Sequence, residues 1–119
     1  MGVLAFFTAS ASDLRKITLG GPMYARIGRY EVAIDRIAEA EEIARKALSF
    51  VRKVPGIKAY SHMMGEDGKG LVVAVYENKA AAGAAAPLVQ QFWLRFSPVL
   101  LAQPRLEEFG AVWALESFG

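Results

Sequence analysis

His62, the only histidine in the chain, is the side chain best suited to acid–base chemistry. An imidazole has an ordinary pKa close to neutrality, so it is the default general acid or base of a protein. Tyr60 lies two residues earlier, and residues two apart on a strand share one face. His62 and Tyr60 are therefore the candidate catalytic residues. The alternative is a histidine that is only exposed or hydrogen-bonded, which is the commoner case on such a strand.

Arg26 is the first candidate for ligand binding, because it lies in the middle of an apolar segment. A guanidinium in such a place needs a carboxylate or an anionic ligand, since an unpaired buried charge is very costly. A glutamate of the same chain or of a second copy is one partner, and an anionic substrate group is the alternative. The hydroxyl of Tyr76 could orient a ligand, and Trp93 could form the flat apolar wall of a pocket. Both rings could equally well serve only for packing.

The composition excludes several classes of function. Fourteen Lys and Arg against twelve Asp and Glu give a net charge of +2, too even to indicate a nucleic-acid partner or an acidic membrane. The chain has no cysteine, which excludes disulfides, thiolate metal sites and thiol catalysis. One histidine cannot form a histidine cluster around a metal. We therefore expect no metal, no nucleic acid and no membrane partner.

The first 22 residues differ from the rest and end in the chain-breaking run Gly20-Gly21-Pro22. Their apolar run covers only residues 3–7 and follows no Lys or Arg, whereas a secretory signal has a basic start and a longer apolar core. We expect residues 1–22 to be an N-terminal extension of uncertain role, either an appendage or an extra packed element. Residues 23–119 then form one domain, which we expect in the cytoplasm.

Hydrophobic periodicity predicts six elements in the order β-α-β-β-α-β. Asp35 is the expected N-cap of the first helix, and Asn78 that of the second helical region, which breaks or restarts at Pro87. The glycine-rich segment 65–70 is typical of a hairpin and does not fit a phosphate-binding loop. The order is that of a ferredoxin-like α+β fold with a four-stranded antiparallel sheet. The predicted strands cover residues 23–31, 57–64, 71–77 and 107–115, and the helical regions cover 35–53 and 78–101.

Two of the predicted strands are apolar on both faces. Residues 71–76 contain no charged side chain, and in the last strand Phe109, Ala111 and Trp113 alternate with further small or apolar residues. The helices of a ferredoxin-like unit cover one face only, and a large exposed apolar sheet is an association surface. We therefore predict a homodimer through the sheet faces. The alternative is that residues 1–22 cover the open face of a monomer.

Three segments together resemble a known family. They are Met-Tyr-Ala-Arg-Ile-Gly-Arg-Tyr-Glu at 23–31, Val-Pro-Gly-Ile-Lys-Ala-Tyr at 54–60 and Val-Ala-Val-Tyr-Glu-Asn-Lys-Ala-Ala at 73–81. Over residues 23–116 the chain is similar to the dimeric α/β-barrel superfamily, and within it to the antibiotic-biosynthesis monooxygenases. This resemblance implies a dimer in which two sheets close an α/β barrel. The haem-degrading branch of that superfamily uses an Asn in the first strand, a Trp and a helical His, of which only the Trp is available here, as Trp93. This chain has no Asn in its first strand, and His62 lies in the second strand, which argues against haem degradation.

The resemblance implies binding of a flat, mostly apolar or phenolic compound between the helices and the sheet. Polyketide oxygenases of the family surround their substrate with Asn, Trp and Tyr side chains, and here Asn78, Trp93, Tyr60 and Tyr76 supply those types. The implied reaction removes a proton from the substrate, through His62 or a tyrosine, and lets O₂ react with the carbanion without metal or flavin. The resemblance therefore implies no cofactor. Two alternatives remain open: a non-catalytic ligand-binding or stress-related dimer, and an isomerase of the same superfamily.

Overall fold

The computed structural model describes residues 22–116 and residue 118. The expected N-terminal extension thus lies, except for Pro22, outside the described residues. The element order confirms the predicted β-α-β-β-α-β plan, with the second helical region divided in two. The elements are β1 (Tyr24–Glu31), the short 3₁₀ helix η2 (Ile34–Arg36), α2 (Ile37–Val51), β2 (Ile57–Met64), β3 (Lys69–Tyr76), α3 (Lys79–Ala84), α4 (Ala86–Phe96) and β4 (Arg105–Phe109).

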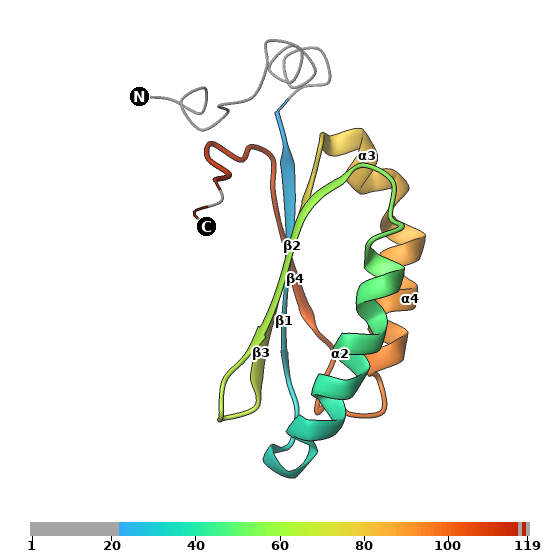
Figure 1. Ribbon diagram of the computed structural model, residues 1–119, viewed down its shortest axis with the longest axis vertical. Coiled ribbons are helices and arrows are strands. Elements are labelled where there is room, and N and C mark those ends of the chain that lie inside the picture. The colour runs from blue at the N-terminus through green and yellow to red at the C-terminus, as the bar shows by residue number, and fades with distance from the viewer. Residues whose placement is uncertain (1–21, 117, 119) are drawn as a thin grey trace.

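The four strands form one antiparallel sheet in the order β2-β3-β1-β4, which is the ferredoxin-like arrangement. Helices α2 and α4 lie side by side on the same face of this sheet (Figure 1). The register places Arg26 of β1 opposite Ala74 of β3 on one side and Glu108 of β4 on the other. Side chains at these positions share the face that the helices cover, here called the inner face.

Local sequence signals account for several element ends. The side-chain oxygen of Asn78 accepts a hydrogen bond from the backbone N–H of Ala81 at 2.8 Å, so the predicted cap of α3 is confirmed. Pro87 stands in the first turn of α4, where its missing N–H costs nothing. In the β2–β3 hairpin Gly68 has φ +83°, a conformation that side chains with a Cβ rarely adopt.

The predicted start of the first helix and the predicted end of the second helical region were both wrong. Asp35 lies in the 3₁₀ turn and does not cap α2, whose N-cap residue Arg36 makes no side-chain capping hydrogen bond to the helix backbone. The second helical region ends at Phe96 rather than near residue 101. Pro98 explains the early end, because it has no N–H to donate to the Leu94 carbonyl, which accepts from the Ser97 N–H at 3.3 Å instead.

The prediction for the last strand was wrong in both position and length. The strand β4 covers residues 105–109 instead of 107–115, and all five of its residues are exposed. Its partner β1 begins at Tyr24 and pairs Ala25 with Phe109, so little partner strand remains beyond that point. The chain then leaves the ladder, and Trp113, expected on a strand face, is 78% exposed.

The main core lies between the inner face and the helices. Phe96 is fully buried there, and Phe92 is almost so. Tyr30 and Val72 of the sheet pack in the same cluster. Complete burial of a phenylalanine side chain contributes roughly 1.5–3 kcal/mol relative to leaving it exposed. No helix within the described residues is long and apolar enough to cross a membrane.

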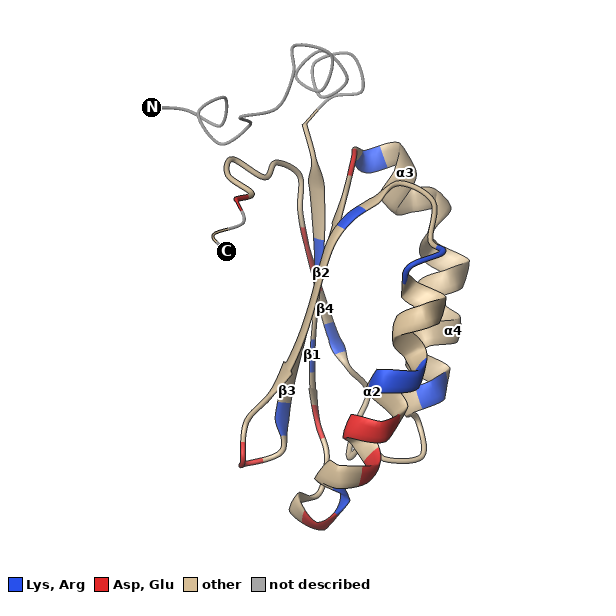
Figure 2. Cartoon of the chain, in the orientation of Figure 1, with Lys and Arg blue, Asp and Glu red and all other residues tan. Residues whose placement is uncertain are grey.

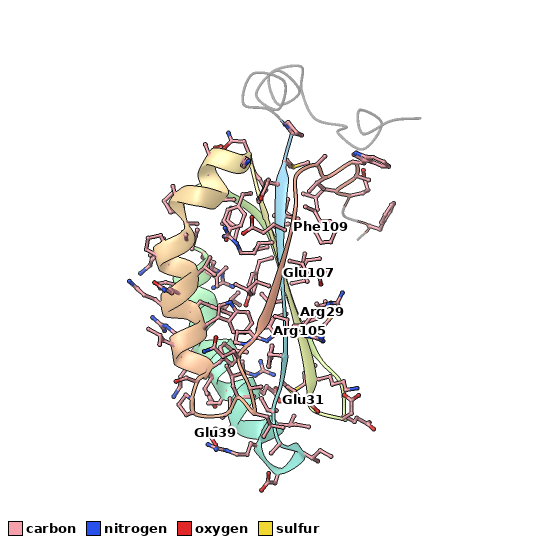
Figure 3. The ribbon with its side chains drawn as sticks, turned by 180° about the vertical axis from the view of Figure 1, so that it is seen from behind. Arg29, Glu31, Glu39, Arg105, Glu107 and Phe109 are labelled. Carbon is pink, nitrogen blue, oxygen red and sulfur yellow. The ribbon has the colours of Figure 1, made fainter. Side chains whose placement is uncertain are left out.

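The opposite side of the sheet, here called the outer face, is partly covered by the chain's own C-terminal segment. Val112 donates a backbone hydrogen bond to the Met23 carbonyl at 3.1 Å, and Val112 and Leu115 pack against Ala25 and Val75. The rest of the outer face has no cover from the described residues. It carries the apolar side chains Ile27, Val73, Leu71 and Met63, and the ion pair of Arg29 with Glu107 at 2.8 Å (Figure 3).

Candidate functional site

Arg26 is a buried cation on the inner face, with only 9% of its surface exposed. Its Nε donates to a carboxylate oxygen of Glu108 at 3.3 Å, which confirms a glutamate of the same chain as its partner. Its two terminal nitrogens donate to the Tyr76 hydroxyl at 3.3 Å and to the Ala82 carbonyl at 3.1 Å. The guanidinium is therefore held in one place by three different elements, β4, β3 and α3.

Glu108 joins Arg26 to a further tyrosine. The Tyr24 hydroxyl donates to the second carboxylate oxygen of Glu108 at 2.5 Å. The hydrogen bond from Tyr24, together with Arg26, holds the pKa of Glu108 below its usual range. The same hydrogen bond raises the pKa of Tyr24. Glu108 thus remains an anion, and its charge balances that of the buried guanidinium.

A small, mostly apolar cavity of about 50 Å³ lies beside Arg26, between the sheet and the helices. Among the described residues, Arg26 is its only charged lining residue, and the other polar side chains are Tyr60 and Tyr76, apart from the indole of Trp93. The cavity is thus an apolar space whose lining includes three residues that carry polar groups. Its apolar lining residues are Gly28, Phe50, Val51, Val54, Ile57, Val72, Ala74, Leu88, Val89, Phe92 and Leu106.

An open groove of about 1020 Å³ runs between α4 and β4 and shares part of its lining with the cavity. The shared residues are Arg26, Val89, Trp93 and Leu106. The Trp93 ring lies directly over Gly28, where any Cβ would overlap it, so this glycine makes room for the indole. Trp93 is therefore part of the wall that separates the cavity from the groove.

The helix that borders this groove carries almost no charge. Figure 2 shows acidic and basic residues along α2 and on the strands, whereas α4 is almost entirely uncharged. Arg95 is the one charged residue of α4, and it lies over the Phe50 ring rather than in the groove. Arg26 and Glu108 are thus the two charged residues of the groove.

His62 does not line the cavity but lies between two tyrosines. Its Nε2 is 2.5 Å from the Tyr30 hydroxyl and its Nδ1 is 3.1 Å from the Tyr60 hydroxyl. Burial lowers the pKa of His62 to about 4, so the imidazole is neutral at pH 7. Burial also raises the pKa of Tyr30 to about 12 and raises that of Tyr60. The three groups therefore form an uncharged hydrogen-bonded chain.

A second groove, of about 520 Å³, lies between α2 and β2, beside the hydrogen-bonded chain of Tyr60, His62 and Tyr30. Tyr30, His62 and Tyr60 all line it. Glu41 and Arg45 of α2 also border it and form an ion pair with each other at 2.5 Å. In the part of the chain that the structure describes, Tyr60 alone lines both this groove and the cavity.

Four of the six predicted site residues meet around the cavity: Arg26, Tyr60, Tyr76 and Trp93. His62 is connected to them through Tyr60. Asn78 is not brought to the cavity, because its side chain caps α3. The predicted roles of these residues in binding or converting a ligand stay predictions.

The sequence pattern did not single out Tyr30 or Glu108 as site residues. Tyr30 is four residues after Arg26 on β1, which places both on one face, so this signal was present. Glu108 could be found only from the register between β1 and β4, which pairs it with Arg26. Within the described residues no group of three His, Cys, Asp or Glu side chains could hold a metal ion.

Comparison with known proteins confirms the resemblance at the level of the fold. No family model matches the sequence, and no curated protein is similar to it. Among solved structures, a protein of unknown function from Nitrosomonas europaea superposes with a TM-score of 0.69 at 16% identity, over 82% of this chain and 96% of that one. Two further structures carry names that bear on function.

One is a candidate antibiotic biosynthesis monooxygenase from Caulobacter crescentus, with a TM-score of 0.66 and 19% identity over 82% of this chain and 98% of that one. The other is SnoaB, a cofactor-independent oxygenase from Streptomyces nogalater, with a TM-score of 0.61 and 18% identity over 76% of this chain and 94% of that one. The chain therefore has the ferredoxin-like fold of the antibiotic-biosynthesis-monooxygenase-like proteins. Identities this low concern the fold alone.

Proposed function

We propose that this chain binds a flat, mostly apolar phenolic compound between the helices and the sheet and oxygenates it without a cofactor. The observation that carries the proposal is Arg26, a single buried cation in the apolar lining that the cavity and the α4–β4 groove share. A ligand pocket typically combines such apolar walls with a few fixed polar groups. The likeness of fold to a cofactor-independent oxygenase supports the reaction type.

The proposed ligand needs more room than the cavity has in this structure. A cavity of about 50 Å³ is far below the size of known ligand sites, roughly 300–1,000 Å³. Because Trp93 forms the wall between cavity and groove, a shift of its ring would join the two spaces. The ligand would then lie along Trp93, with an oxygen atom directed at Arg26.

The side chains present suit a reaction in which the substrate itself supplies the reactivity. Arg26 and the Tyr76 hydroxyl would stabilise negative charge on a substrate oxygen as a neighbouring C–H loses its proton. The resulting carbanion gives its electrons to O₂, a methylene becomes a carbonyl, and the second oxygen atom leaves as water. The apolar walls exclude bulk water from the charged intermediate.

A second candidate is a non-catalytic binding protein of the same fold, favoured by a different observation. Within the described part of the chain, every buried side-chain nitrogen and oxygen already has a hydrogen-bond partner. Arg26 is occupied by Glu108, Tyr76 and Ala82, and both ring nitrogens of His62 are occupied by tyrosines. Such groups could hold the ligand in place without taking part in a reaction.

Oxygen consumption by metal-free protein separates these candidates. Anthrones and hydroquinones are offered in turn, and binding is followed separately by quenching of tryptophan fluorescence. Arg26→Met should lower kcat/KM about 10- to 100-fold, because hydrogen bonds to a charged group contribute about 1.5–3 kcal/mol. Arg29→Met is the matched control, since Arg29 lies on the same strand but is paired with Glu107 on the outer face.

Binding without oxygen uptake would support the non-catalytic protein. Neither binding nor uptake across the panel would contradict both candidates. Equal losses in Arg26→Met and Arg29→Met would remove Arg26 from the site.

We also propose that the chain forms a homodimer through the part of the outer face left open by its C-terminal segment. Ile27, Leu71 and Val73 are partly exposed there, and Met63 is 49% exposed. Sedimentation velocity at micromolar concentration should give twice the chain mass of 12.9 kDa. Val73→Lys, which places a charge in the centre of this surface, should give the monomer. Particles of the single-chain mass in the unaltered protein would contradict the dimer.

A further inference from the structure

Tyr60 connects two spaces that are otherwise separate. Its side chain lines the small cavity beside Arg26 and also the groove between α2 and β2. From Tyr60 the hydrogen bonds continue to His62 and then to Tyr30, which both line the groove and do not line the cavity. A continuous chain of three polar groups thus leads from Tyr60, a residue of the cavity lining, along the α2–β2 groove.

The chemistry of the three groups allows a proton to pass along this chain. A neutral imidazole has one N–H donor and one acceptor nitrogen, and each tyrosine hydroxyl can donate and accept at the same time. When Tyr60 donates to Nδ1 of His62, the Nε2–H of His62 donates to the Tyr30 oxygen, and the Tyr30 proton can point to water. Every group then has a donor on one side and an acceptor on the other.

The surroundings of His62 favour a neutral ring at rest. The rings of Phe92 and Phe96 of α4 lie 6.2 and 5.4 Å from the imidazole, centre to centre, and bring no charge. From α2, the charged residues that border the same groove are Glu41 and Arg45, which are paired with each other. Burial keeps the pKa of His62 low, at about 4, so the imidazole remains uncharged between pH 5 and pH 8.

We propose that Tyr60, His62 and Tyr30 form a proton relay that carries the proton released by the substrate from the cavity to the α2–β2 groove. The proposal rests on the proposed function, which requires that a substrate C–H proton leave the cavity.

In the relay the Tyr60 oxygen accepts the substrate proton while its own proton passes to Nδ1 of His62. The Nε2 proton passes to the Tyr30 oxygen, and the Tyr30 proton passes to a water molecule in the groove. The substrate is left as a carbanion, the water becomes hydronium, and His62 changes its tautomer without becoming charged. Because Tyr60 contacts the substrate in this scheme it is a catalytic residue, whereas His62 and Tyr30 act through it.

Deuterium exchange into an anthrone under anaerobic conditions tests the relay apart from oxygen chemistry. Wild-type protein in D₂O should exchange the methylene protons of the anthrone well above the rate in buffer. Tyr60→Phe, Tyr30→Phe and His62→Gln should each lower the exchange rate at least tenfold. His62→Gln is informative because an amide keeps hydrogen bonds to both tyrosines but cannot change tautomer. Ser61→Ala is the matched control, since Ser61 lies between Tyr60 and His62 on the outer face.

Two further measurements separate the relay from a merely structural role. The affinity for the anthrone should be unchanged in Tyr30→Phe, because Tyr30 does not line the cavity. Protein labelled with ¹⁵N in the histidine ring gives the signal of His62 alone, and Tyr30→Phe should shift Nε2 while Tyr60→Phe shifts Nδ1. A folded variant with these shifts and slow exchange supports the relay.

The outcomes for the relay and for the oxygenase can be told apart. Exchange without oxygen uptake supports the relay and contradicts the oxygenase. Oxygen uptake that is equal in wild type and Tyr30→Phe overturns the relay and leaves the oxygenase in place. Absence of exchange in the wild-type protein, or exchange at the wild-type rate in Tyr30→Phe, also overturns the relay.

Discussion

Acid should destabilise this protein through His62. The folded state holds the imidazole neutral, with its pKa lowered from 6.5 to about 4 by burial. Between these two values the unfolded chain binds a proton that the folded chain does not bind. The free energy of unfolding should therefore be unaffected by His62 above pH 7, fall as the pH is lowered from 6.5, and stop falling through this residue below pH 4.

The size of the effect follows from the shift. One pKa unit corresponds to about 1.4 kcal/mol, so a lowering from 6.5 to about 4 would amount to roughly 3 kcal/mol for a fully enclosed ring. The ring is only partly buried and borders the α2–β2 groove, where solvent screens its charge. We therefore expect a loss of about 2 kcal/mol between pH 7 and pH 4, after discounting for this screening.

Urea unfolding of wild type and His62→Gln at several pH values isolates this contribution. Carboxylates titrate in both proteins, so the difference between the two free energies of unfolding reports His62 alone. That difference should change by about 2 kcal/mol from pH 7 to pH 4, in the direction of a relatively less stable wild type in acid. A difference that does not vary with pH, or a ¹⁵N titration of His62 with a pKa near 6.5, would refute a buried neutral imidazole.

Three other predictions concern the packing and the Arg26 network. Gly28→Ala should destabilise by about 1–3 kcal/mol and shift the emission of Trp93, because the new Cβ overlaps its ring, whereas Gly110→Ala, with nothing near its Cβ, should have little effect. Phe96→Ala should lower the free energy of unfolding by about 3–5 kcal/mol, and Leu94→Ala, at a position 67% exposed, should not; similar urea curves for both would contradict this core. Tyr24→Phe should raise the pKa of Glu108, because the hydrogen bond that lowers this pKa is lost. Carboxyl ¹³C NMR measures the titration of Glu108, and an unchanged titration would show that the hydrogen bond does not affect the pKa.

The fold could be predicted where local signals and burial agree. The bounds of β2 were predicted correctly, because Pro55 and Gly56 precede it and a glycine-rich turn follows it. The break between α3 and α4 near Pro87 was predicted for a similar reason. The strand β4 was misplaced because its five residues are all exposed, so an edge strand left no alternation of buried and exposed positions to detect.

The candidate site was predictable only as a set of residue types. The pairing of Arg26 with Glu108 joins positions 82 residues apart, and it depends on a register that no local pattern encodes. The contact of His62 with Tyr30 is still harder to predict from the sequence, because β3 lies between their two strands. Side chains that meet across an intervening strand can be located only when the whole sheet is known.

The hydroxyl of Tyr30 reaches His62 because the strand between them has no side chain at Gly70, and the phenol ring rests on that bare backbone. A methyl group at position 70 would push the ring away from the sheet. Gly70→Ala would thus disconnect the imidazole from Tyr30 while all three polar groups remain in the protein. The hydrogen bond between Tyr30 and His62 therefore depends on the glycine at position 70 as much as on the histidine and the tyrosine themselves.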